Sequence, residues 1–246
     1  RSIRESEIAL TKRLIERYDR IIAGRGIVMT DVDLDIVRLV ATSEVEEAKQ
    51  SKTEDNVFAM VRRIGQAKAT LAADYTVQLA QNVGKVVFFA KHIDVMDVAE
   101  AHFAKAGLRT TSIRGDQSAA ARTAAIDDFT NDPEVQVIVC SLTAAGVGIN
   151  LQVASNVVLA ELSWTSAEQT QAIDRVHRIG QEMPVTAWRI LAAQTIDSRI
   201  ADLIDSKEGL AARALDGSDS GLEPSESVQV AALIALLSDA VRTRGF

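Results

Sequence analysis

Three polar residues, Gln171, Arg175 and Arg178, have the types and the spacing to bind an anion. Ser166 and the glutamine three residues after it have the spacing of a capping box, and Gly180 is typical of the residue that follows a helix. The pattern therefore predicts a helix on which the three side chains share one face. Because each guanidinium offers a planar pair of donors to phosphate oxygens, this face is suited to a polyanion.

The alternative interpretation of this face is an ordinary solvated surface, with Asp174 and Glu182 as ion-pair partners of the arginines. The segment Q-A-I-D-R-V-H-R-I-G-Q favours the first interpretation, because it resembles motif VI of the SNF2 family of DNA-dependent ATPases. The resemblance implies that Arg175 and Arg178 reach across a cleft to the phosphates of a nucleotide. It places Gln171 in the same catalytic group.

A glycine-containing segment, C-S-L-T-A-A-G-V-G-I-N-L, follows the third apolar run of the chain. Gly146 and Gly148 let backbone amides approach a phosphate or a sugar, although a tight turn explains the same pair. The segment resembles motif V of the family. The resemblance implies that the glycines lie at the nucleotide and that Asn150 contacts its ribose. It also implies DNA phosphate contacts at Ser141 and Thr143.

Two residues of this segment depart from the family pattern S-T-R-A-G-G-L-G. Thr143 stands where many members have an arginine, and Ala145 stands where they have a glycine. The departure weakens the expectation of a basic DNA contact at Thr143. Together with V-V-L-A-E-L-S-W-T, the segment is most similar to the annealing-helicase branch of the family.

Further candidate DNA contacts lie at the ends of other expected strands. Lys91 and His92 end the stretch F-F-A-K-H, which resembles motif IV, and Arg114 with Gly115 follows the next apolar run. Trp164 precedes the helix of the arginines, and the resemblance implies that it couples the DNA track to the ATP cleft. The structural alternatives stay open, since basic residues at strand ends are often only solvated and a lone tryptophan is often a buried aromatic.

Apolar runs rich in β-branched residues alternate with helical patterns in the second half of the chain, which predicts a parallel sheet buried on both faces. The expected strands are residues 85–90, 108–113, 135–140, 156–161 and 185–191. The expected helices between them are residues 93–106, 118–130 and 166–180. In such α/β sheets ligands lie at the carboxyl ends of the strands, where the candidate residues fall.

The family resemblance implies that this region is a RecA-like lobe, the second of a helicase motor. We expect a helical linker at residues 1–66, the RecA-like lobe at 67–217, and a linker with a terminal helix at 218–246. Helical patterns outside the sheet cover residues 3–24, 31–48, 55–79, 196–215 and 228–241.

Composition restricts the kind of partner. The chain has 246 residues and a formal net charge of −7, which argues against a broad nucleic-acid-binding face but leaves room for a narrow basic track. A lone Cys140 excludes a disulfide framework, and three scattered histidines without cysteine partners argue against a metal site. No apolar run approaches transmembrane length, so we expect no membrane partner.

The sequence holds no G-x-x-x-x-G-K-[ST] loop and no D-E-x-H segment, so a cradle for phosphates and Mg²⁺ is missing. Because the chain also opens at Arg1 rather than Met, we expect a fragment whose first RecA-like lobe, on the same polypeptide, holds ATP and the metal. The intact protein is then expected to hydrolyse ATP on double-stranded or branched DNA, and the fragment alone to be inactive. The tail could contact a protein partner. The expected location is the nucleoid-associated cytoplasm of a bacterium or a eukaryotic nucleus.

Two other interpretations remain. The first is a non-catalytic DNA- or protein-binding module derived from such a motor, although the intact Gln171, Arg175 and Arg178 speak against decay. The second is an unrelated flavodoxin-like domain. It would need a ligand loop after the first strand, where A-K-H lacks the small hydroxyl and glycine residues of such a loop.

Overall fold

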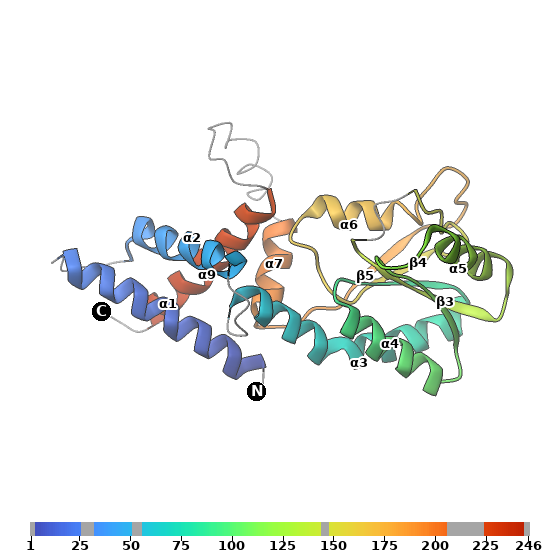
Figure 1. Ribbon diagram of the computed structural model, residues 1–246, viewed down its shortest axis with the longest axis horizontal. Coiled ribbons are helices and arrows are strands. Elements are labelled where there is room, and N and C mark those ends of the chain that lie inside the picture. The colour runs from blue at the N-terminus through green and yellow to red at the C-terminus, as the bar shows by residue number, and fades with distance from the viewer. Residues whose placement is uncertain (1–2, 26–31, 51–55, 144–147, 206–223, 244–246) are drawn as a thin grey trace. The chain divides into compact units, whose positions relative to one another are not determined.

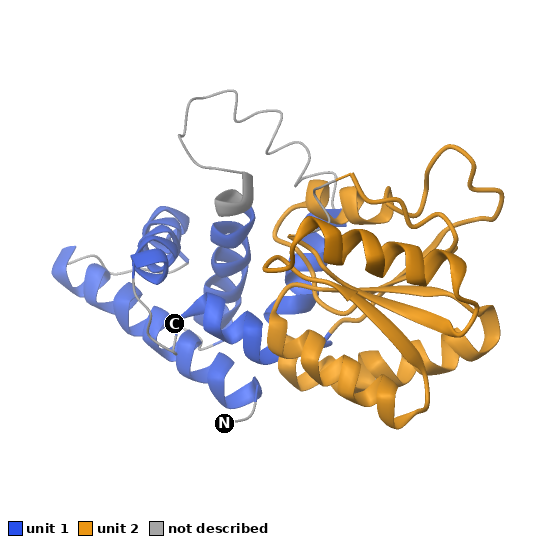
Figure 2. Ribbon diagram, turned by 45° about the vertical axis from the view of Figure 1, so that its right-hand side comes forward, with its two compact units in different colours: residues 1–64, 192–246 blue, residues 65–191 orange. Residues whose placement is uncertain are grey.

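The computed structural model describes residues 3–25, 32–50, 56–143, 148–205 and 224–243. The chain divides into two compact units, which are coloured separately in Figure 2. One unit consists of residues 65–191, and the other consists of residues 1–64 together with residues 192–246.

The unit of residues 65–191 is built on a five-stranded sheet (Figure 1). Its strands are β1 (Val86–Ala90), β2 (Arg109–Ile113), β3 (Val135–Ser141), β4 (Asn156–Leu159) and β5 (Thr186–Arg189). The spatial order is β2-β3-β1-β4-β5, and every neighbouring pair is parallel. The parallel sheet predicted from the apolar runs is therefore confirmed, with all five strands present.

Helices pack on both faces of this sheet. They are α3 (Val57–Val83, of which the part from Gly65 belongs to this unit), α4 (Ile93–Lys105), α5 (Ala119–Asn131) and α6 (Ser166–Ile173). Successive residues of β1 point to opposite layers, as the pleat of a strand requires. Phe88 packs with α3 and α4, and its ring meets that of Phe103 edge to face at 5.5 Å. Phe89 packs in the other layer with Phe129 of α5.

Burial on both faces is partial at the edge strand β2 and is lost at the other edge strand, β5, whose four residues are all exposed. The sequence predicted a fully buried strand here, but β5 is an edge strand and has a strand neighbour on one side only. Trp188 keeps part of its packing, because its ring meets that of Tyr75 edge to face at 5.5 Å. Its indole N–H also donates to Oδ1 of Asn156 at 3.1 Å.

The start of α6 differs by one residue from the capping box predicted at Ser166. The cap is Thr165, which has extended backbone angles and whose hydroxyl accepts a hydrogen bond from the backbone N–H of Glu168 at 3.3 Å. The glutamine of the predicted box, Gln169, is buried and donates from Nε2 to the carbonyl of Ser163 at 3.3 Å.

The end of α6 differs more, because the helix stops at Ile173 and not at Gly180. Arg175 and Arg178 therefore lie on turns after the helix, and the three candidate side chains do not share one helical face. Just after this helix end, the carbonyl of Arg175 accepts a hydrogen bond from the backbone N–H of Leu151, a residue distant in sequence, at 2.8 Å. That carbonyl would otherwise continue the helical ladder.

The second unit is helical. It contains α1 (Ile3–Arg25), α2 (Leu34–Gln50), the beginning of α3, α7 (Ile196–Asp205) and α9 (Pro224–Thr243). The C-terminal helix α9 contacts α1, α2 and α7, so the two ends of the chain share one core. Leu14, Tyr18, Val37, Leu233 and Leu237 are fully buried there. The predicted helix of residues 196–215 is described as far as Asp205, and its remainder lies outside the described residues.

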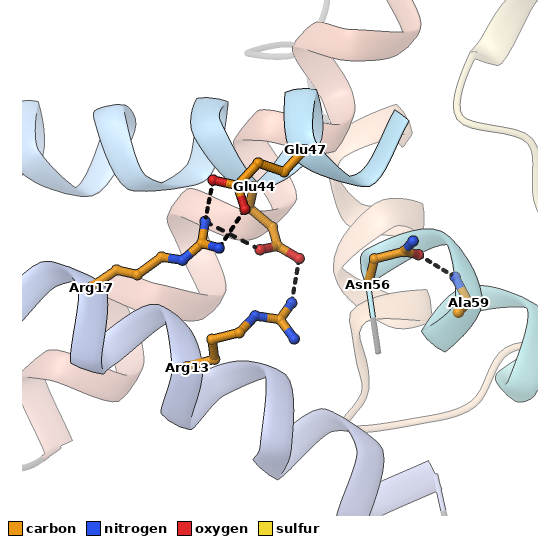
Figure 3. Close-up of polar contacts among 6 residues, drawn as sticks. All are labelled: Arg13, Arg17, Glu44, Glu47, Asn56 and Ala59. Carbon is orange, nitrogen blue, oxygen red and sulfur yellow. Dashed lines mark hydrogen bonds and ion pairs between the residues drawn. The ribbon is translucent and has the colours of Figure 1, made fainter. Parts of the chain in front are cut away.

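Polar contacts join α1 to α2 in this unit (Figure 3). The buried carboxylate of Glu44 lies 2.5 Å from Arg13 and 3.6 Å from Arg17. Arg17 also pairs with the exposed Glu47 at 2.5 Å. Asn56 is an N-cap for α3, because its side-chain oxygen accepts a hydrogen bond from a backbone N–H three residues later, at 2.9 Å.

Candidate functional site

The candidate residues gather at one edge of the parallel sheet, because the carboxyl ends of its strands meet there. Ala90 at the end of β1 pairs with Ser141 at the end of β3, and Phe89 pairs with Leu159 of β4. The candidate residues at or after the ends of β1 to β4 are Lys91, His92, Arg114, Gly115, Ser141, Thr143 and Trp164.

A residue that the sequence did not single out, Glu161, organises this edge. Its carboxylate accepts hydrogen bonds from the backbone N–H groups of Lys91 and His92 at 2.8 and 2.9 Å. Its other oxygen lies 2.7 Å from Nδ1 of His92. Glu161 is only 3% exposed. The available signal was a charged residue inside an otherwise apolar run, which calls for specific partners.

Lys91 and Trp164 are in contact. The ammonium of Lys91 lies over the indole ring of Trp164, 5.8 Å from its centroid, and the tryptophan is buried. Burial lowers the pKa of Lys91, and the carboxylates of Glu168 and Glu161 offset part of this shift. Trp164 is thus a buried aromatic that also contacts a basic side chain, and its coupling role stays a prediction.

Arg114 is engaged by α4. Its guanidinium lies 2.7 Å from Asp97 and 2.9 Å from Glu100. The carbonyl of its neighbour Gly115 accepts a hydrogen bond from Nη2 of Arg122 at 2.8 Å. A DNA phosphate at Arg114 would therefore compete with two carboxylates that already neutralise its charge.

The segment after β3 is described in part. The hydroxyls of Ser141 and Thr143 lie 2.8 Å apart, with Ser141 buried and Thr143 exposed. Gly146 lies outside the described residues. Gly148 has φ +42°, in the region that favours glycine. Asn150 is exposed, and its Oδ1 accepts a hydrogen bond from a backbone N–H two residues later at 3.2 Å.

The two arginines after α6 differ in burial. Arg175 is half-buried, and its Nε is enclosed without a hydrogen-bond partner among the described residues. Arg178 and Gln171 are exposed, and Nη1 of Arg178 lies 3.5 Å from the carbonyl of Ile149. Within the described part of the chain neither guanidinium forms an ion pair. The ion pairs of the surface interpretation, with Asp174 and Glu182, are therefore not formed among the described residues, although the exposure of Gln171 and Arg178 fits a solvated surface.

The sequence predicts neither a metal site nor a membrane-spanning helix. Among the residues that the structure describes, no group of three or more His, Cys, Asp or Glu side chains could hold a metal ion. In the same part of the chain no helix combines the length and the apolar character needed to cross a membrane.

Residues 67–180 match the family model of the helicase conserved C-terminal domain. The chain is 34% identical over 142 residues to helicase-like transcription factor CHR27 of Arabidopsis thaliana. It is 39% identical over 129 residues to DNA repair protein RAD5 of Cryptococcus neoformans. These alignments cover 58% and 51% of this chain but 14% and 11% of the two relatives, so the chain spans a small part of their length.

Among solved structures, the C-terminal part of the Fun30 ATPase domain superposes with a TM-score of 0.60. The match covers 96% of this chain and 93% of that chain at 17% sequence identity. At this identity the likeness concerns the fold alone. The RecA-like architecture expected from the sequence is thereby confirmed.

Proposed function

We propose that this chain is the second motor lobe of a DNA-dependent ATPase of the SNF2 type, because residues 67–180 match the helicase conserved C-terminal domain. The family predicted from the motifs is confirmed, whereas kinship with the annealing-helicase branch stays a prediction. In this proposal Arg175 and Arg178 stabilise the charge that develops on the transferred phosphoryl group of ATP.

One observation carries the proposal. The guanidiniums of Arg175 and Arg178 belong to turns after α6, have no ion-pair partner among the described residues, and include an enclosed Nε without an acceptor. Arg178 is exposed, so its guanidinium can reach acceptors that lie outside this lobe. A polyphosphate on a second lobe would supply such acceptors.

The first lobe completes the proposal. The described residues include no group of three or more side chains that could ligate a metal ion, and the sequence holds no phosphate-binding loop, so in this proposal ATP and Mg²⁺ would be held by the first lobe of the same polypeptide. Chain 1–246 alone would then hydrolyse no ATP. The nucleotide side of this lobe would be formed by Gly146, Gly148 and Asn150, with Gln171 beside the arginines.

DNA would be bound as double-stranded or branched substrate along the strand-end edge, with Lys91 and His92 as the principal contacts and the buried Trp164 supporting Lys91 from behind. The names of two relatives, DNA repair protein RAD5 and helicase-like transcription factor CHR27, support a motor that works on DNA. Weaker candidates are Arg114, Gly115, Ser141 and Thr143. A DNA motor of this kind would work at a bacterial nucleoid or in a nucleus.

The test uses the polypeptide that carries both lobes. Arg178→Ala and Arg175→Ala are each expected to lower DNA-stimulated kcat by about 10³-fold or more, while the Kd for DNA changes less than about threefold. Arg109→Ala is the matched control, since Arg109 is an exposed arginine of the same unit that pairs with Asp132 at 2.9 Å. Unchanged turnover in Arg178→Ala would refute the proposal. An intact protein that binds DNA but hydrolyses no ATP would favour the non-catalytic module.

A further inference from the structure

The carboxamide of Gln181 connects two segments that are distant in sequence. Its Nε2 donates to the carbonyls of Gln152 and Ala154 at 2.9 and 2.8 Å, and it lies 3.4 Å from that of Val176. Its Oε1 accepts a hydrogen bond from the backbone N–H of Met183 at 3.0 Å. The side chain therefore uses both amide hydrogens and its oxygen, a combination that a carboxamide provides and a carboxylate or an apolar group does not.

Other contacts join the same two segments. The backbone N–H of Leu151 donates to the carbonyl of Arg175 at 2.8 Å. Gly180 has φ +101°, a conformation that favours glycine, and it lies beside the side chain of Gln152. The turns that carry the arginines are thus hydrogen-bonded to the segment between β3 and β4 both before Arg178, at Arg175, and after it, at Gln181.

From these contacts we propose that Gln181 is a positioning residue, which fixes the turns bearing Arg175 and Arg178 so that the guanidiniums are preorganised for phosphate. This inference rests on the proposed function. Since α6 ends at Ile173, the helix does not set the direction of these side chains. Arg178 is exposed, and its contact with Ile149 at 3.5 Å is long, so it does not hold itself in place. Charge stabilisation by arginine depends on such placement, and an error of about 1 Å can cost about 10²-fold in rate.

The variants isolate the carboxamide. Gln181→Met has a similar length but neither the donors nor the oxygen acceptor, and Gln181→Glu keeps the shape while placing a negative charge against carbonyl oxygens. Glu182→Gln is the matched control, because Glu182 is the exposed neighbour. In the two-lobed protein, Gln181→Met and Gln181→Glu are expected to lower kcat by about 10- to 100-fold. The KM for ATP should stay within about threefold of the wild type, and Glu182→Gln should match the wild type.

A purely structural role makes a different prediction. It would lower kcat only through loss of folded protein, so activity would return when the assay is run at a temperature at which circular dichroism shows the variant to be fully folded. Positioning predicts that the loss of kcat persists in the fully folded variant. Should Gln181→Met not fold, Gln181→Asn replaces it with the same expectation, because it keeps the amide but is shorter by one methylene.

Arg178→Ala, assayed beside these variants, separates the two proposals. If Arg178→Ala is inactive while fully folded Gln181→Met keeps the wild-type kcat, the positioning role is wrong and the motor function stands. If Arg178→Ala keeps the wild-type kcat, the motor function itself fails. A persistent kcat loss in both, at unchanged KM, supports the positioning role.

Discussion

The imidazole Nδ1 of His92 lies 2.7 Å from a carboxylate oxygen of Glu161, where β1 and β4 end beside each other. The second carboxylate oxygen accepts hydrogen bonds from the backbone N–H groups of Lys91 and His92. One buried acid thus ties the segment after β1 to the segment after β4. Because Lys91 in turn lies over Trp164, the proposed DNA contacts on both segments depend on the same carboxylate.

Replacing Glu161 should therefore destabilise the fold. Glu161→Ala leaves two backbone donors and the His92 ring without an acceptor, and we expect it to lower the free energy of unfolding by about 3–5 kcal/mol. Glu161→Gln keeps one oxygen acceptor and should cost less, about 1.5–3 kcal/mol. Urea denaturation of chain 1–246 measures both. Glu134→Ala, at an exposed position of the same unit, should stay within about 0.5 kcal/mol of the wild type. A loss in Glu161→Ala no larger than that of this control would contradict the role of the carboxylate.

Substituting Gly65 should also destabilise the fold, because the hydrogen-bonded carboxylate of Glu161 lies against it. A Cβ on Gly65 would lie 2.2 Å from Oε1 of Glu161, and three hydrogen-bonded contacts prevent this carboxylate from moving aside. Gly65→Ala is expected to destabilise the chain by about 1–3 kcal/mol, although alanine favours a helix. Gly24→Ala is the control, since nothing lies within 4 Å of a Cβ there, and it should stabilise by about 0.5–1 kcal/mol. Thermal and urea unfolding of the two variants would give opposite signs.

Lys91 should reduce stability at neutral pH. Burial lowers its pKa below the usual 10.5, so the folded protein binds fewer protons than the unfolded chain between the lowered pKa and 10.5. The free energy of unfolding therefore rises with pH across that window. Below the window Lys91 is charged in both states, and the full cost of burying its charge is present. Lys91→Met is expected to be more stable than the wild type at pH 7, and the difference should shrink as the pH approaches 10.5. Urea unfolding at several pH values measures it. A stability difference that does not change with pH would contradict the buried charge of Lys91. If Lys91 also contacts DNA as proposed, Lys91→Met should bind DNA more weakly.

The fold was predictable where burial and local signals agree. The strands β1, β3 and β4 lie in apolar runs rich in β-branched residues, and Ser118 marks the start of α5 with a hydroxyl that accepts from a backbone N–H at 3.2 Å. The exposure of β5 was not predictable, because the run of residues 185–191 does not show that its strand has a neighbour on one side only.

The site was predictable in its location but not in its contacts. Parallel strands bring their carboxyl ends together wherever the pattern places them, so the gathering of candidate residues follows from the strands. The end of α6 at Ile173 coincides with a hydrogen bond from Leu151, which no local spacing reveals. The roles of Glu161 and Gln181 likewise depend on partners at least 27 residues away for their main hydrogen bonds.

The helical unit offers a comparison of a buried and an exposed acid on one helix (Figure 3). The side chain of Glu44 is 3% exposed and lies between Arg13 and Arg17, whereas that of Glu47 is 59% exposed and pairs only with Arg17 among the described residues. Glu44→Ala should lower the free energy of unfolding by about 1–3 kcal/mol, because it removes the buried carboxylate that pairs with Arg13 and lies near Arg17, while burial, which raises the pKa of Glu44, offsets part of this contribution. Glu47→Ala should cost no more than about 1 kcal/mol.

The stability losses of the two variants should also differ in their dependence on salt concentration. Raising the ionic strength from 0.1 to 1 M shortens the screening length from about 10 to about 3 Å, which weakens exposed pairs far more than enclosed ones. The difference between the wild type and Glu47→Ala should therefore vanish at high salt, while most of the difference for Glu44→Ala remains. Equal losses for the two variants in urea unfolding, or equal salt sensitivity, would mean that the joint between α1 and α2 is held by apolar packing and not by the enclosed ion pairs.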